Sequence, residues 1–449
     1  MNIWGILGEI LFKALALFFL LFSIFSFLEK ERRASFRSFL FFFFILSLNF
    51  TFFLLEPHLK NWLFGSIFIL TMLAIFLLLL FPPKRKSIEI VGEQEKIDER
   101  DIIFSRFDYK EGTDIFDDYY KKRPEYKDLD DEIRKIPDIL SPHHIEKDPW
   151  LFALASAEFD FLEHQITQVS GDKNKEEVES SPAENTRKIK NIINYLGSEA
   201  SGICLLNQAY VYSHVGRGPE PYGKEIELNH KYAIVFALEM DTLMIASAPK
   251  APVIVETGKK YVEASRISII VAMFIRRLGY SARAHIAGSN YQALLPPLAW
   301  EAGLGELGRL GILITHKFGP RARLGLVTTE LPLIPDKPKA LGIQDFCQKC
   351  QKCARNCPVQ AIPYGEKIKE NGVLKWVLNR EECYRFWRKA GTDCAVCIYV
   401  CPYSKTDNIF HNFIRKIEEK SSVAQTLSVW GDDIFYGRFP LRRKPPLDI

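Results

Sequence analysis

Eight of the chain's nine cysteines lie between residues 347 and 401, and their spacing constrains this part of the chain more than any other feature. The first four form a C-x2-C-x2-C-x3-C-P run, and the last three a C-x2-C-x3-C-P run, with one cysteine between the runs. The eight are Cys347, Cys350, Cys353, Cys357, Cys383, Cys394, Cys397 and Cys401. Structural zinc sites favour paired C-x2-C knuckles rather than three cysteines in succession. The spacing therefore predicts two [4Fe–4S] clusters rather than zinc sites or disulfides.

The order of the cysteines also predicts how they are shared. In two-cluster ferredoxins the fourth cysteine of each run ligates the other cluster. Applied to this chain, one cluster is held by Cys347, Cys350, Cys353 and Cys401. The other is held by Cys357, Cys383, Cys394 and Cys397. Such a pair indicates a protein that moves single electrons at low potential. The ninth cysteine, Cys204, lies in an apolar run and is predicted to be a small buried hydrophobe.

The first 83 residues differ in composition from the rest and are predicted to be a membrane anchor with three transmembrane helices. About 20 apolar residues cross the hydrocarbon core as a helix. Three segments approach this length, at residues 3–28, 39–55 and 62–81. A cleaved signal peptide is the alternative, but three spans and the absence of a small-residue cleavage site argue against it.

The basic residues around these segments predict an orientation. Lys30, Arg32, Arg33 and Arg37 lie in the first loop and residues 84–86 follow the third segment, whereas the other loop offers only Lys60. Positive residues stay in the cytoplasm, so we expect a multi-pass protein of the inner (cytoplasmic) membrane with its large C-terminal part facing the cytoplasm. Reduced thiolates agree with that compartment. Arg32-Arg33 ahead of an apolar run is the competing twin-arginine export signal, but the preceding apolar segment makes it a poor match.

The remaining residues are predicted to form layers of helices and strands. Strands are predicted at 202–206, 232–238 and 282–287, and a long amphipathic helix at 258–278. Ser181-Pro-Ala-Glu184 forms a capping box that opens a helix to about residue 196. The net charge of +4 is spread thinly, without the basic stripe that nucleic-acid binding needs, so no nucleic-acid partner is expected.

An ordered series of motifs across residues 96 to 440 resembles the cobalamin-dependent reductive dehalogenases, which are related to epoxyqueuosine reductases. The motifs are Asp98–Asp101, Phe104–Arg106, Gly112-Thr113, Tyr119-Tyr120, Tyr212–His214, His230–Ile234, Glu239–Asp241, Pro297–Arg309, Phe318–Arg321 and Trp430–Arg438. The order is more specific than any one motif.

The resemblance implies an α/β (α+β) fold with a nitroreductase-like, corrinoid-binding core and a ferredoxin-like double-cluster module. It divides the chain into a linker and N-terminal family region at 84–180, a corrinoid-binding core at 181–340, the cluster module at 341–405 and a C-terminal tail at 406–449 that packs on the core. The cofactors implied are two [4Fe–4S] clusters and a cobalamin bound base-off. The chain has no D-x-H-x-x-G box, which agrees with a free lower face of the cobalt.

The resemblance also suggests catalytic residues. Tyr261, on the helix at 258–278, is the expected proton donor, and Arg309 its cationic partner or, alternatively, a salt bridge holding its turn. Asn290 occupies the position of the catalytic aspartate of epoxyqueuosine reductases, or Ser289 does if the register slips by one. An asparagine cannot perform that acid chemistry, which favours dehalogenation. Tyr291 is the next candidate for the proton donor.

The expected corrinoid-binding residues come from the same loops. They are Ser289, Tyr291, Gly303, Gly305 and Gly308, of which the glycines permit a close backbone approach to a bulky ligand.

The sequence therefore predicts an oxidoreductase that removes halide from a small organohalide. Its other partners are the lipid bilayer and an unidentified electron donor, either low-potential or quinol-linked. The alternatives are an epoxyqueuosine-reductase-like cobalamin enzyme and a membrane-bound iron–sulfur electron carrier without dehalogenase activity.

Overall fold

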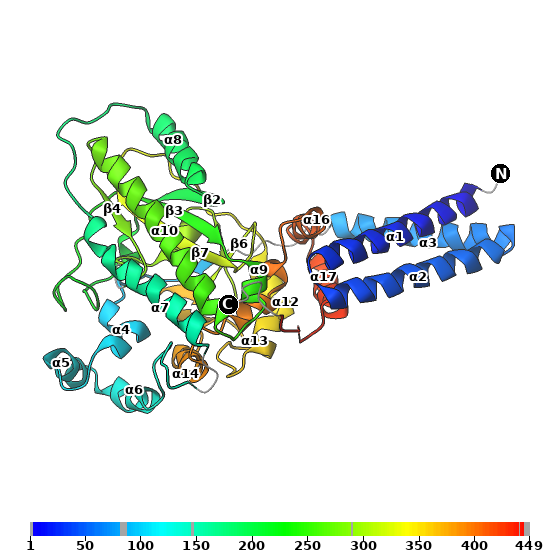
Figure 1. Ribbon diagram of the computed structural model, residues 1–449. Coiled ribbons are helices and arrows are strands. Elements are labelled where there is room, and N and C mark those ends of the chain that lie inside the picture. The colour runs from blue at the N-terminus through cyan, green and yellow to red at the C-terminus, as the bar shows by residue number, and fades with distance from the viewer. Residues whose placement is uncertain (1–2, 81–87, 145–147, 289–290, 440, 444–449) are drawn as a thin grey trace. The chain divides into compact units, whose positions relative to one another are not determined.

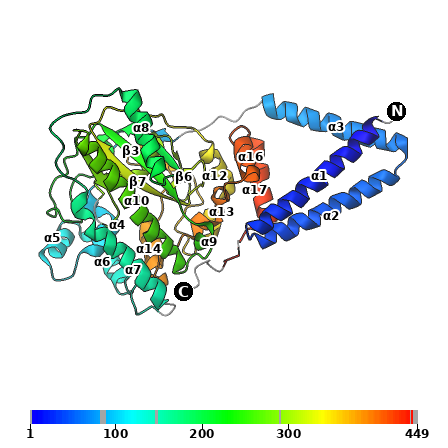
Figure 2. The ribbon, with the colours of Figure 1, turned by 45° about the horizontal axis from the view of Figure 1, so that its top comes forward.

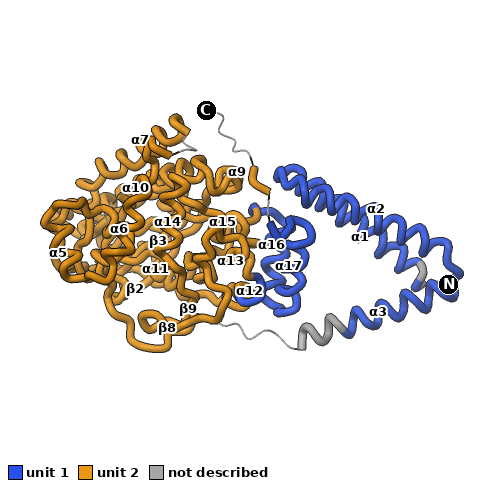
Figure 3. Tube along the Cα trace, turned by 90° about the horizontal axis from the view of Figure 1, so that it is seen from below, with its two compact units in different colours: residues 1–85, 348–350, 406–440 blue, residues 86–347, 351–405, 441–449 orange. Residues whose placement is uncertain are grey.

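The computed structural model describes residues 3–80, 88–144, 148–288, 291–439 and 441–443 (Figure 1). The chain forms two compact units (Figure 3). The N-terminal unit comprises residues 1–85, 348–350 and 406–440, and the core unit comprises 86–347, 351–405 and 441–449.

The N-terminal unit contains long apolar helices where the sequence predicts them. These are α1 (Ile3–Leu28), α2 (Arg32–Leu54) and α3 (Pro57–Leu80), and α1 packs on both others. Two stretches are long and apolar enough to cross a membrane, Ile6–Leu28 with a mean hydropathy of 2.4 and Arg32–Leu54 with 1.8. The side chains of residues 74–80 lie outside the described part of the chain, so the third span stays a prediction.

The C-terminal tail differs from its predicted packing. Residues 406–440, which include α16 (Ile409–Glu418) and α17 (Ser422–Phe435), belong to the N-terminal unit rather than to the core. The reason is aromatic packing, because Phe410 and Phe435 pack edge-on or tilted against phenylalanines of α1 and α2. Residues 441–443 lie in the core unit, where the Arg443 amide donates to the Ala246 carbonyl at 3.0 Å.

The core unit is built on a four-stranded sheet in the order β2-β3-β7-β4. The strands are β2 (Ala200–Leu205), β3 (Tyr232–Glu239), β7 (Ala322–Thr329) and β4 (Ala282–His285). All neighbouring strands pair antiparallel, so the fold is α+β. The three strands predicted from sequence are confirmed to within two residues at each end, whereas β7 lies in a stretch not predicted as a strand.

Alternation along β3 buries both faces of the sheet. Ile234 and Phe236 face a cluster that includes residues of α8 (Pro182–Tyr195) and α10 (Pro252–Arg277). Ala233 and Val235 face a second cluster that includes residues of α11 (Leu295–Glu301). Figure 2 shows α8 and α10 lying over one face of the sheet. The sheet is therefore the middle of three layers, and α10, which carries Tyr261, packs on one face of it.

Two local predictions are confirmed. The Ser181 hydroxyl accepts from the Glu184 amide at 3.2 Å, so the predicted cap opens α8. Cys204 is buried, and its thiol donates to the Leu298 carbonyl at 3.5 Å. Burial raises the pKa of the Cys204 thiol, which leaves it a buried hydrophobe rather than a reactive thiol.

The remaining elements lie before, between and after these layers. The helices are α4 (Ile103–Asp108), α5 (Asp114–Lys122), α6 (Lys127–Arg134), α7 (Pro149–His164), α9 (Thr242–Ile245), α12 (Ile343–Cys350), α13 (Lys352–Asn356), α14 (Arg380–Ala390) and α15 (Val396–Val400). The strands are β1 (Glu89–Ile90), β5 (Gly305–Leu307), β6 (Leu313–Thr315), β8 (Ile368–Glu370) and β9 (Val373–Lys375).

Candidate redox site

The two cysteine runs fold into matching turns. Gln351 follows Cys350 with a φ of 52°, and Ala395 follows Cys394 with a φ of 50°. In each case this left-handed residue, unusual for a side chain with a Cβ, begins a five-residue helix, α13 or α15. Each helix ends at a Cys-Pro step. The two runs are therefore a structural repeat, in which each turn presents its cysteines in the same way.

The cysteines predicted to hold one cluster influence one another electrostatically. Burial, with smaller contributions from Cys383 and Cys357, raises the pKa of Cys394 to about 12. Burial also raises the pKa of Cys397, with smaller contributions from Cys394, Cys383, Cys353 of the other set, and Cys357. Bound iron would relieve this arrangement, because a coordinating thiol is deprotonated and its charge is balanced by the metal. These four thiols fit a cluster.

The other predicted set is also buried. Cys347, Cys350, Cys353 and Cys401 are each less than 9% exposed, and none of the nine cysteines forms a disulfide. Among the described residues, no three His, Cys, Asp or Glu side chains gather as they would around a single metal ion. The cysteines of a cubane cluster lie farther apart than the ligands of one ion, because four irons lie between them.

Tyr261 lies beside an arginine that the sequence did not single out. The Arg323 guanidinium of β7 is 5.1 Å from the centre of the Tyr261 ring. Arg323 donates to the Thr257 hydroxyl at 2.8 Å and to the Asp393 carboxylate at 3.3 Å. Thr257 in turn donates to Asp393 at 2.7 Å. Because Asp393 precedes Cys394, this network joins the helix of Tyr261 to the cluster module.

Two features of this site point to a ligand. The Arg323 Nε is buried without a hydrogen-bond partner among the described residues. Ser265 and Ser268, on the same helix as Tyr261, are also buried and have hydroxyls without a partner in the described part of the chain. A buried polar group without a partner is costly, so these atoms are available to a polar ligand.

Tyr291 belongs to the same neighbourhood. Burial raises its pKa well above the usual value; nearby Tyr261 raises it further, and nearby Arg323 and Arg217 oppose the rise. The structure thus brings together the predicted proton donor and one predicted corrinoid-binding residue. Ser289 and Asn290, which precede Tyr291, lie outside the described residues.

Arg309 makes its contacts in the cluster module. Its side chain is fully buried and donates to the carbonyls of Cys347 at 3.1 Å, Pro363 at 2.7 Å and Gly365 at 3.0 Å. Its guanidinium also lies 4.4 Å from the centre of the Trp376 ring. These contacts fix the backbone around the first cysteine, so the arginine placed over Tyr261 is Arg323 and not the predicted one. Arg323 could not be identified from the sequence because strand β7, which carries it, was not predicted.

The predicted glycines are explained by packing within the chain. A Cβ on Gly305 would lie 2.2 Å from the Ile314 carbonyl oxygen, across the β5–β6 pair. A Cβ on Gly308 would lie 2.4 Å from the Ile314 side chain. Gly303 has a φ of +74° after the end of α11. Their expected contact with a corrinoid stays a prediction.

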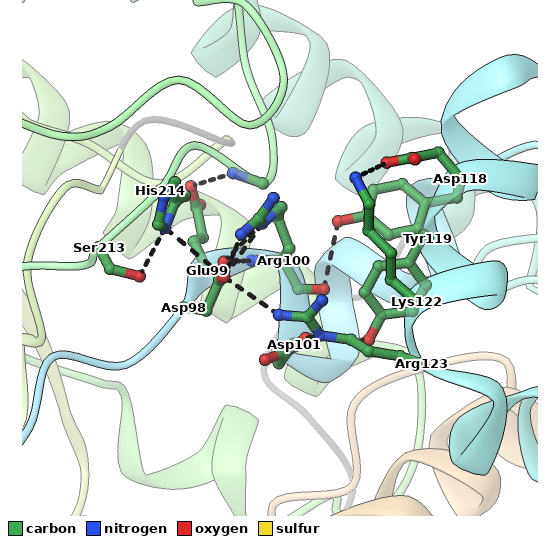
Figure 4. Close-up of polar contacts among 12 residues, drawn as sticks. Asp98, Glu99, Arg100, Asp101, Asp118, Tyr119, Lys122, Arg123, Ser213 and His214 are labelled. Atoms are coloured by element: carbon green, nitrogen blue, oxygen red, sulfur yellow. Dashed lines mark hydrogen bonds and ion pairs between the residues drawn. The ribbon is translucent and has the colours of Figure 1, made fainter.

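Motifs distant in sequence meet in the N-terminal family region (Figure 4). Asp98 accepts from Arg100 at 2.6 Å and from Arg123 at 3.2 Å, and lies 3.6 Å from His214. Tyr119 donates to Asp101 at 3.2 Å. Burial opposes ionisation of Asp98, but the hydrogen bonds from Arg100 outweigh it and lower its pKa. These motifs therefore form a scaffold of ion pairs.

Comparison with known proteins agrees with this architecture. A family model described as a 4Fe-4S dicluster domain matches residues 346–405. The tetrachloroethene reductive dehalogenase of Dehalobacter restrictus is 38% identical over 216 residues, which are 46% of this chain and 38% of that protein. The Sulfurospirillum multivorans enzyme of the same name is 30% identical over 288 residues, 57% of each chain. The chain thus spans between about two fifths and three fifths of these relatives' lengths.

Solved structures give the same result. A catabolic reductive dehalogenase in complex with 3-bromo-4-hydroxybenzoic acid matches with a TM-score of 0.65 and 25% identity, over 80% of this chain and 49% of that one. In sequence, an epoxyqueuosine reductase of Francisella is also similar, at 34% identity over 116 residues, 24% of this chain and 31% of that protein. By sequence and by fold, the matched parts of the chain are similar to reductive dehalogenases.

Proposed function

We propose that this chain is a membrane-anchored reductive dehalogenase that removes halide from a small organohalide. The observation that carries the proposal is the network Tyr261–Arg323–Thr257–Asp393. It joins a tyrosine and a cation in the core to the residue before Cys394, so a proton-donating group and a redox module are linked through three side chains.

We assign the cluster ligands as the cysteine order predicts. Cys357, Cys383, Cys394 and Cys397 hold one cluster, which the influence of Cys357 on Cys383, and of both on Cys394, supports. Cys347, Cys350, Cys353 and Cys401 hold the other. When bound, the two clusters would supply single electrons to the core.

A corrinoid, when bound, supplies a strongly reducing cobalt that cleaves a carbon–halogen bond. The chain offers Ser289, Tyr291 and the loop of Gly303, Gly305 and Gly308 to hold it, together with the buried polar atoms beside Tyr261. We expect the base-off form, because the chain lacks the box that supplies a histidine to cobalt in other enzymes.

The chain's own residues handle the proton and the charge. Tyr261 donates a proton from its hydroxyl to the carbon that loses the halogen. Arg323 lies over the same ring and stabilises the negative charge that develops on the tyrosine and the departing halide. Thr257 and Asp393 hold the Arg323 guanidinium in position. Arg309 holds the cluster module instead of acting on the substrate.

We propose that the catalytic part faces the cytoplasm. Four basic residues at the end of the α1–α2 hairpin support this orientation, namely Lys30 in the loop and Arg32, Arg33 and Arg37 at the start of α2. Arg33 donates to the Phe439 carbonyl at 2.9 Å, so half of the twin-arginine pair has a structural role in the folded protein. A reporter that works only in the cytoplasm should be active when fused after Ile449 and inactive when fused at Lys60; the reverse pattern would mean export.

The activity is tested with the full chain purified without oxygen and loaded with cobalamin. Tetrachloroethene and brominated hydroxybenzoates are screened with a low-potential chemical reductant, and halide release is measured. Release that requires cobalamin supports the proposal. A protein that binds iron and sulfide but no corrinoid, and releases no halide, would be an electron carrier.

A further inference from the structure

The exposed surface of the C-terminal helices has an unusual composition. Between residues 409 and 439, every exposed side chain is either large and apolar or basic. The apolar ones are Ile409, Phe413, Ile414, Val423, Leu427, Trp430, Ile434 and Phe439. The basic ones are Lys416, Lys420 and Arg438. An aqueous surface would carry acidic and uncharged polar side chains as well, so this composition indicates a different environment.

The apolar residues of α17 form one stripe. Val423, Leu427, Trp430 and Ile434 are spaced four, three and four residues apart, which places them on one face of the helix. They are between 48% and 64% exposed. A continuous exposed apolar face of this kind marks an interaction surface, whereas single exposed apolar residues are normal on a protein surface.

Other aromatic residues of α16 and α17 pack on the membrane helices. The Phe410 ring lies 5.1 Å from Phe25 and 5.7 Å from Phe18, both on α1. The Phe435 ring lies 5.4 Å from Phe41 of α2. The two tail helices therefore contact α1 and α2 within the same compact unit.

These contacts reach far along the apolar helices. A helix rises about 1.5 Å per residue, so Phe18 lies about 15 Å along α1 from its last residue, Leu28. Phe41 lies about 13 Å along α2 from its first residue, Arg32. The part of α1 between Phe18 and Leu28 carries no charge. The contacts with α1 therefore place Phe410 beside the apolar part of that helix. The contact with α2 independently does the same for Phe435.

The ends of the tail are fixed at the loop between α1 and α2. Glu29 accepts from Thr406, Asn408 and His411. Burial opposes ionisation of Glu29, but these hydrogen bonds and the His411 side chain lower its pKa. Beyond α17, Arg33 donates to the Tyr436 and Phe439 carbonyls. The tail thus starts and finishes at one end of the two spans.

We infer that α16 and α17 form a second membrane-binding element, which lies in the lipid leaflet at the α1–α2 loop. The apolar stripe faces acyl chains, and Trp430 suits the headgroup boundary. Lys416, Lys420 and Arg438 face anionic headgroups. This inference rests on the proposed membrane anchoring, and commits to lipid as the occupant of the exposed face.

The tail helices also contact Lys349, which lies in the predicted cluster module. Lys349 donates to the Ser422 hydroxyl at 2.6 Å and to Gln425 at 2.8 Å. Residues 348–350, which end at the predicted ligand Cys350, belong to the same unit as the tail helices. One compact unit therefore carries the lipid-facing surface and a cluster-ligand segment.

The test uses a photo-cross-linking phenylalanine analogue, p-benzoylphenylalanine, in the full chain with both clusters. It replaces Phe413 in one variant, Phe43 of α2 in a second and Phe161 of α7 in a third. All three side chains are exposed, at 60%, 52% and 49%. Each protein is placed in nanodiscs of phosphatidylethanolamine and phosphatidylglycerol and irradiated, and lipid adducts are identified by mass.

Lipid adducts at positions 413 and 43 but not at 161 support the inference. An adduct at 43 with none at 413 overturns it and leaves the anchoring intact. The absence of an adduct at 43 overturns the anchoring itself. Trp430 replaced by the same analogue gives a second site on the tail, so a variant at 413 that fails to fold does not decide the outcome. Cluster absorbance identifies the folded variants.

Discussion

The guanidinium of Arg323 lies 5.1 Å from the centre of the Tyr261 ring, and the same guanidinium donates to Asp393, the neighbour of Cys394. A tyrosine on α10, an arginine on β7 and an acid in the cluster module therefore form one connected site. This relationship gives the first two predictions.

Tyr261→Phe removes the hydroxyl and leaves the ring in place over Arg323. General-acid groups contribute about 10²–10⁴-fold to rate, so we expect kcat for halide release to fall by that factor. Iron content and bound corrinoid should match the wild type. A wild-type rate in this variant would show that the proton comes from another group, and Tyr291 would be tested next.

Arg323→Gln removes the cation beside Tyr261. We expect kcat to fall by about 10²–10³-fold, the usual loss when a preorganised charge is removed, with a smaller change in KM. Arg323→Lys should recover part of the rate because it retains the charge. Arg309→Gln is the matched control: it removes the guanidinium that donates to the carbonyls of Cys347, Pro363 and Gly365, of which Gly365 keeps a bond from Trp376, and it should lower cluster content or thermal stability. If the Arg309→Gln protein has a normal rate per intact cluster and the Arg323→Gln enzyme is slow, Arg323 acts on the reaction and Arg309 only holds the cluster module.

Cluster reconstitution should give about eight irons and eight sulfides per chain. Cys350→Ala should remove one cluster, and Cys383→Ala the other. Each variant should keep the EPR signal of the remaining cluster. Zinc in place of iron after anaerobic reconstitution would contradict the assignment of these cysteines.

Gly437→Ala should loosen the C-terminal tail. Gly437 has a φ of +91°, and a Cβ there would lie 2.1 Å from an Arg33 nitrogen. The left-handed conformation alone costs about 1–2 kcal/mol with a Cβ. We expect faster proteolysis within residues 406–439. Gly431→Ala, in the middle of α17 with open space around it, should instead stabilise the helix by up to about 1 kcal/mol. Equal proteolysis rates in the two variants would argue against this packing.

Glu158 should make stability depend on pH near neutrality. Burial, together with the nearby Glu256 carboxylate, raises the pKa of Glu158 to about 7. Because the folded pKa lies above the unfolded value, the protonated carboxyl favours the folded state at low pH, and this contribution is lost as the pH rises through 7. Glu158→Gln stays neutral, so its melting temperature should exceed that of the wild type at pH 8 by more than at pH 5.5. A difference between the two proteins that does not change with pH would mean that Glu158 does not titrate in this range.

Sequence alone determined the features that depend on local pattern. The cysteine spacing predicted a double-cluster module, because ligand order along the chain decides which thiols can meet. The apolar segments predicted the long helices α1, α2 and α3, because hydrophobic length is a property of consecutive residues. The strands β2, β3 and β4 and the cap at Ser181 followed from alternation and side-chain chemistry within a few residues.

The tertiary structure decided which distant residues meet. Arg309 and Arg323 are both arginines near the glycine-rich stretch, and only the register of β7 against β3 and β4 puts the second over Tyr261. The position of the tail likewise depends on ring contacts of Phe410 and Phe435 with phenylalanines of α1 and α2, which lie hundreds of residues earlier in the chain. Contacts of this kind depend on how sheets and helices pack, and no local pattern in the chain specifies them.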